Sequence, residues 1–86
     1  MSEEDYLKFK ILWNLAHSRP RIWGASNTPI KNVTRGLPKD KIGACLSVAE
    51  KLIKERILLS HKKGKLVSLN VKKIKEIMEF LESFHE

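Results

Sequence analysis

The chain has 86 residues, enough for one domain with a modest core, and its 42% hydrophobic and 31% charged residues exclude a disordered chain. Its single cysteine excludes an internal disulfide and a cysteine-based zinc site. Of its net charge of +7, residues 17–75 contribute 15 basic and 3 acidic side chains, whereas residues 76–86 carry 4 acidic and none basic. A basic middle between acidic ends is typical of a surface that binds a polyanion, although a solvated lysine-rich surface gives the same totals.

A first helix is predicted from the amino terminus to Ala16 or His17. Ser2 and Asp5 have the spacing of a capping box, and the following Arg19-Pro20 disfavours further helix. Two apolar stripes at helical spacing follow, one of Leu7, Ile11 and Leu15, the other of Tyr6, Phe9 and Trp13. One stripe is expected to face the domain's own core and the other the last helix or a partner chain. A helix fully enclosed by its own domain is the alternative.

A connector over residues 18–28, with a short strand at Arg21–Trp23, leads to a second helix. Thr28 is its expected N-cap, Pro29 its first residue and Gly36 its stop, about two turns on.

A third helix is predicted from Pro38 or Lys39 to Glu55 or Arg56. Its inward face is expected to carry Ile42, Leu46, Ala49 and Ile53, widened by Cys45 and Leu52. Its outward face is expected to carry Asp40, Ala44, Ser47, Val48 and Lys51.

A hairpin and a last helix complete the predicted elements. Two β-prone runs, Ile57–Ser60 and Lys65–Leu69, flank a loop in which Gly64 supplies the positive φ that a tight turn requires. Asn70 is the expected cap of a helix from Val71 to about Phe84. Its apolar stripe is Val71, Ile74, Ile77, Met78, Leu81 and Phe84.

This order of elements resembles the winged helix-turn-helix family of DNA-binding domains. The stretch A-E-K-L-I-K-E-R-I-L-L at residues 49–59 is similar to the family's exit from the recognition helix into the first wing strand, and Gly36 falls at the turn between the two helices. The resemblance implies a mainly α fold with a small β-hairpin (α+β) in one domain, residues 1–86. Within it the helix-turn-helix covers about 28–56, the wing about 57–69 and the C-terminal helix about 70–85.

The resemblance implies a recognition helix in the major groove of double-stranded DNA and a basic wing on the phosphate backbone. On the helix the expected contacts are Lys39, Lys41, Ala44, Ser47 and Lys51. Ala44 or Val48 is expected against a thymine methyl group. On the wing and backbone they are Lys62, Lys63, Lys65, Thr28, Lys31, Arg35, Arg19 and Arg21. The alternative interpretation is that each of these is a solvated surface residue without a role in binding.

Other classes of function find less support in the sequence. His17, His61 and His85 lack metal-ligand spacing, Cys45 is expected to be a buried, inert thiol, and no catalytic constellation or phosphate loop is present. We therefore expect no enzyme, no cofactor and no metal. The acidic amino terminus and the lack of a long apolar run predict a soluble, cytoplasmic protein. The resemblance to DNA-binding domains implies that it is associated with the nucleoid.

Two functions remain at this stage. The first is a DNA-binding transcriptional regulator, homodimeric through its first and last helices. The alternative is a winged-helix module that binds protein or RNA in a larger complex.

Overall fold

A computed structural model describes residues 3–17 and 27–84 of the chain. Its elements are α1 (Glu3–Ala16), β1 (Thr28–Pro29), the 3-10 helix η1 (Ile30–Thr34), α2 (Lys39–Lys54), β2 (Leu58–His61), β3 (Leu66–Leu69), the 3-10 turn η2 (Val71–Lys73) and α3 (Ile74–Ser83). The described chain is mainly helical with a small three-stranded antiparallel sheet, an α+β fold as predicted. None of its helices is long and apolar enough to cross a membrane.

The hairpin is confirmed, with each strand starting one residue later than predicted. Leu58 pairs with Leu69 at its base, and His61 pairs with Leu66 beside the turn. The turn uses left-handed backbone at three successive residues, with φ of 50° at Lys62, 56° at Lys63 and 84° at Gly64. Gly64 adopts this φ without the steric cost that a Cβ imposes.

The predicted second helix is wrong in type and in its first residues. Thr28 and Pro29 form β1, which pairs with the free edge of β3 and gives the sheet order β1-β3-β2. The backbone N–H of Ile30 donates to the carbonyl of Lys65 at 2.9 Å, so sheet pairing extends to the first residue of η1. Only five residues of 3-10 helix follow, and Gly36, with φ of 84°, turns the chain into α2. The predicted strand at Arg21–Trp23 and the cap at Ser2 lie outside the described residues.

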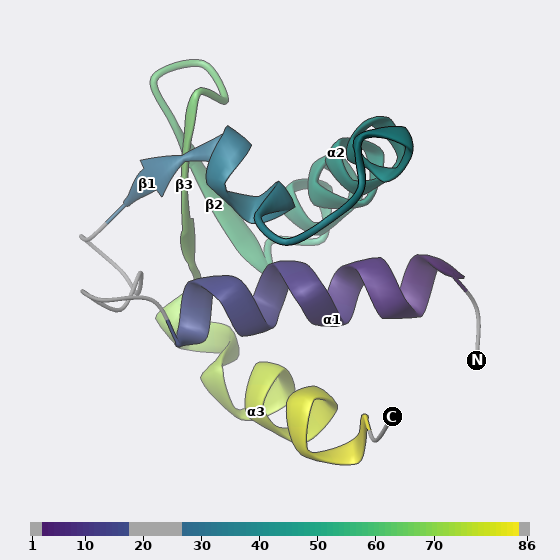
Figure 1. Cartoon of the computed structure of the whole chain (residues 1–86). Helices are drawn as coiled ribbons and strands as arrows, with labels where there is room; N and C mark the ends of the chain where they lie inside the picture. The colour runs from purple at the N-terminus through teal and green to yellow at the C-terminus, as the bar shows by residue number, and fades with distance from the viewer. Residues whose placement is uncertain (1–2, 18–26, 85–86) are drawn as a thin grey trace.

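The core is built around α1, which crosses the middle of the molecule between two layers (Figure 1). The sheet, η1 and α2 lie on one side of it, and α3 lies on the other. Leu7, Ile11 and Leu15 are buried against the first layer, as one of the two predicted stripes requires. Phe9 of the second stripe stacks on Phe84 after α3, with ring centroids 4.5 Å apart. The second stripe therefore meets the last helix, one of the two partners expected for it.

The last helix differs from its prediction at its start. Asn70 does act as a cap, since its side-chain oxygen accepts from the Lys72 backbone N–H at 3.0 Å, but the capped turn is η2. The predicted apolar stripe divides into two halves. Ile77, Leu81 and Phe84 are buried, whereas Val71, Ile74 and Met78 are exposed.

Candidate nucleic-acid interface

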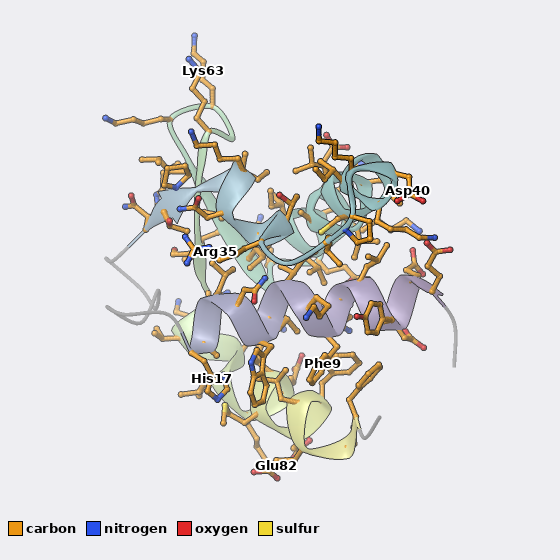
Figure 2. All side chains as sticks on the ribbon, viewed as in Figure 1. Phe9, His17, Arg35, Asp40, Lys63 and Glu82 are labelled. Carbon is orange, nitrogen blue, oxygen red and sulfur yellow. The ribbon has the colours of Figure 1, made fainter. Side chains whose placement is uncertain are left out.

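Four exposed lysines gather at the tip of the hairpin. Lys62, Lys63 and Lys65 lie in or beside the β2–β3 turn. Because the Ile30 N–H is bonded to the Lys65 carbonyl, Lys31 at the start of η1 lies next to this turn. Figure 2 shows Lys63 pointing away from the body of the molecule. We call Lys31, Lys62, Lys63 and Lys65 the lysine cluster.

The two chain segments that supply the lysine cluster contain no acidic side chain that could neutralise it. Residues 27–39, which form β1 and η1, and residues 56–75, which form the hairpin and the start of α3, contain no acidic side chain. The like charges of the cluster repel one another through water, at a cost that an approaching polyanion removes. This arrangement favours binding to a row of phosphates.

Two other residues of the predicted backbone set are placed differently. Thr28 is half-buried, and its hydroxyl oxygen accepts from the Asn32 side-chain amide at 2.7 Å, so it holds η1 in place. Arg35 lies close to α1 (Figure 2), where it lines a cavity of about 190 Å³ with Asn14 and His17. The structure therefore does not bring Arg35 to the lysine cluster. Arg19 and Arg21 lie outside the described residues.

The exposed face of α2 is turned relative to its prediction. The buried side chains are Cys45, Val48, Ala49 and Leu52, so Val48 packs in the core and is not available to a thymine methyl group. The predicted inward residues Ile42, Leu46 and Ile53 are only half-buried. Val48 lines a small cavity with Glu4, Asp5 and Lys8 of α1, so α1 packs on this side of α2 and buries Val48 although the adjacent positions of the helix are polar.

Of the five residues predicted on the recognition helix, three remain on an open surface. Lys39, Ala44 and Ser47 are exposed. Exposed acidic residues also lie on this helix, Asp40 in its first turn and Glu50 further along. The face of α2 is therefore mixed in charge, in contrast to the lysine cluster.

The other two predicted residues, Lys41 and Lys51, are paired with the first turn of α1. Lys41 Nζ lies 2.6 Å from an oxygen of Glu3, and Lys51 forms the corresponding ion pair with Glu4. The hydrogen bond and the charge of the glutamate raise the pKa of each lysine. A raised lysine pKa favours folding at neutral pH, and this contribution is lost only as the pH rises through that pKa. All four side chains are solvent-exposed, so each pair is a weak tie that a competing phosphate can replace.

A second basic site lies at the base of the hairpin and was not predicted from the sequence. Arg56, Lys72 and Lys73 line a cavity of about 480 Å³ together with Leu59 and Asn70. The Asn70 side-chain amide donates to the Arg56 carbonyl at 2.7 Å, which fixes Arg56 in left-handed backbone with φ of 62°. The sequence signal for this site is the close spacing of Lys72, Lys73 and Lys75 directly after the hairpin.

Cys45, His17 and His61 have structural surroundings that account for them. Cys45 is buried, and burial raises the pKa of its thiol, so it stays protonated at neutral pH as an inert thiol should. His61 Nε2 lies 3.1 Å from the buried Ser68 hydroxyl, and His17 stacks on Trp13. No group of three metal-ligating side chains occurs among residues 3–17 and 27–84.

Comparison of the chain with protein-family models, with curated proteins and with solved structures gives no match.

Proposed function

We propose that this chain is a winged helix-turn-helix domain that binds double-stranded DNA, with the β2–β3 hairpin as its wing. The order of elements supports the proposal: α1, β1, η1, α2, a hairpin and α3, with the strands arranged β1-β3-β2. In this arrangement η1 takes the place of the short second helix, and α2 takes the place of the recognition helix.

The observation that carries the proposal is the lysine cluster at the hairpin tip. Its four lysines come from two segments that are at least 31 residues apart in the sequence. A hydrogen bond of 2.9 Å from the Ile30 N–H to the Lys65 carbonyl joins the two segments. Charges on a protruding tip reach phosphates on either side of a groove without requiring the body of the domain to approach. Phosphate contacts supply most of non-specific affinity, so the cluster accounts for binding and not for sequence recognition.

The mixed charge of α2 limits what that helix contributes. Ala44 and Ser47 are small enough to allow close approach to a groove, and a serine hydroxyl hydrogen-bonds several bases without strong preference. Lys41 and Lys51 must leave Glu3 and Glu4 before they reach DNA. We therefore propose binding dominated by the phosphate backbone, with weak sequence preference.

The test is a fluorescence-anisotropy titration of a labelled 20-base-pair DNA duplex at several salt concentrations, beside an RNA duplex of the same sequence. Four phosphate contacts predict that log affinity falls with log salt at a slope of about −4. Tighter binding to DNA than to RNA supports the proposal. No binding to DNA at about 50 mM salt refutes it, and tighter binding to the RNA duplex replaces it with an RNA-binding function.

The ion pairs between α1 and α2 give a prediction of increased affinity. In the double variant Glu3→Gln/Glu4→Gln, Lys41 and Lys51 lose their glutamate partners. They can then bind phosphates without first breaking an ion pair, so we expect DNA affinity to rise by about threefold to tenfold. The matched control is Glu76→Gln/Glu79→Gln on α3, which changes the net charge equally at a distance from α2. Equal effects of the two double variants in the anisotropy titration would show that net charge alone is responsible.

A further inference from the structure

An apolar groove lies between α1 and α3, on the side of α1 away from α2. Its volume is about 740 Å³, and its lining includes Phe9, Trp13, His17, Met78 and Leu81. Figure 2 shows Phe9 and His17 pointing from α1 into the space beside α3. The aromatic rings along its α1 wall are stacked, with the Trp13 and His17 centroids 3.8 Å apart and those of Phe9 and Trp13 5.6 Å apart.

Large apolar side chains around this groove remain in contact with water. Of the side chains that line it, Trp13 is 44% exposed and Met78 is 38% exposed. Ile74 lies one turn before Met78 on α3, outside the groove, and is 49% exposed. Single exposed apolar residues are ordinary, but a contiguous apolar patch marks a binding surface. A chain of 86 residues has few large apolar side chains to spare from its core.

The two walls of the groove carry opposite charges. Lys10 lines it from α1, and Glu82 lines it from α3. Neither side chain forms an ion pair within the part of the chain that the structure describes. The helices run antiparallel (Figure 1), and Phe9 stacks on Phe84. One step forward on α1 therefore corresponds to one step back on α3, which places Lys10 and Glu82 at nearly the same level on opposite walls.

We infer that this groove is the interface of a homodimer, formed with a second copy of this chain. A two-fold axis that lies in the interface and runs along the groove sets α1 of one subunit against α3 of the other. Lys10 then faces Glu82 of the partner subunit, and Glu82 faces Lys10 of the partner subunit. The same operation brings the two rows of exposed apolar side chains together, as a self-complementary interface requires.

The size of the two helices limits the affinity of this dimer. Helices of 14 and 10 residues, at 1.5 Å per residue, present a face about 20 Å long and two helix diameters wide. Such a face buries less than a standard interface of about 800 Å² per partner, so we expect a dissociation constant in the micromolar range. The β2–β3 turn, which carries most of the lysine cluster, lies on the other side of α1 from α3 (Figure 1), so dimerisation leaves it free.

The test is sedimentation equilibrium of the full chain with charge reversals at the two walls. The wild type is expected to be in monomer–dimer equilibrium, and Lys10→Glu or Glu82→Lys alone is expected to weaken association at least tenfold. An equimolar mixture of the two variants restores association, because in the mixed dimer one Lys10–Glu82 pair keeps its native charges and the other pair has them exchanged. Lys39→Glu on α2 is the matched control and leaves association unchanged. Circular dichroism establishes that every variant is folded.

Three results would overturn the inference. A wild type that stays monomeric at 200 µM (roughly tenfold or more above the expected dissociation constant) assigns the groove to a different partner. If neither charge reversal changes the dissociation constant of the dimer, the interface lies elsewhere on the molecule. Single variants that weaken association without mutual rescue exclude the two-fold pairing of Lys10 with Glu82. None of these results bears on DNA binding, which the anisotropy titration tests separately.

Discussion

Replacing Lys62, Lys63 and Lys65 together by glutamine is expected to lower the affinity for duplex DNA at least tenfold at about 100 mM salt. The three side chains supply most of the lysine cluster, and none of them has an ion-pair partner among the described residues. Each lost phosphate contact removes about 0.9 from the slope of log affinity against log salt, so the slope should become shallower by about 2.7. Glutamine keeps two of the four methylene groups of lysine and removes the charge, and we expect the hairpin backbone to stay unchanged. The readout is the anisotropy titration at four salt concentrations.

The matched control for this triple variant is Lys72→Gln/Lys73→Gln/Lys75→Gln. It removes the same charge from the opposite end of the hairpin and the start of α3. We expect it to lower affinity by less than half as much on a logarithmic scale, because long-range attraction is screened over about 10 Å at this salt. Equal losses from the two triple variants would mean that the hairpin tip is not the contact, and a larger loss from the control would move the site to Arg56 and its neighbours.

The second large effect is on stability, at the centre of the fold. Ile11 is fully buried in α1 between the two layers, and Ile11→Ala is expected to lower the free energy of unfolding by about 2 to 5 kcal/mol. A domain of this size has only about 4 to 13 kcal/mol in total. The variant should therefore melt about 8 °C or more below the wild type, at roughly 4 to 8 °C per kcal/mol. Chemical denaturation followed by circular dichroism measures the change.

The same substitution at an exposed position serves as its control. Ile74 is half-exposed on α3, so Ile74→Ala should cost less than about 1 kcal/mol. The measurement is made at low micromolar protein, where dimerisation contributes little. Similar losses at both positions would contradict a core centred on α1.

The hairpin, the first helix and the capped turn after β3 were predictable because each depends on local chemistry. Gly64 supplies the positive φ at the turn, Asn70 caps the turn that follows β3, and the stripe of Leu7, Ile11 and Leu15 has the period of a helix. These features need no knowledge of the rest of the chain.

Features that depend on distant partners could not be predicted in the same way. Thr28 and Pro29 have the residue types of a helix start, but the free edge of β3, nearly forty residues later, takes them as a strand. Val48 lies on the polar side of α2 in the sequence pattern and is buried because α1 packs there. The charges of Lys41 and Lys51 suit DNA, but the glutamates that pair with them lie 38 and 47 residues earlier in the sequence, in the first turn of α1.

The candidate site depends both on local chemistry and on contacts between distant segments. Lys62, Lys63 and Lys65 follow from the hairpin alone, and the structure adds Lys31 to them through the bond between Ile30 and Lys65. The orientation of α2 follows from tertiary packing. Ala44 and Ser47 are exposed as predicted, whereas Lys41 and Lys51 form ion pairs with α1. Phosphate binding was therefore more predictable from the sequence than base contact.

The most direct test of DNA binding through the hairpin tip is a ¹H–¹⁵N NMR titration of the full chain with a short DNA duplex. We predict that amide shifts change at residues 61–66, at residues 28–34 and in the amino-terminal half of α2, while residues 74–83 of α3 stay unchanged. Changes confined to α3 and the groove beside Trp13, with none at the hairpin tip, would contradict it.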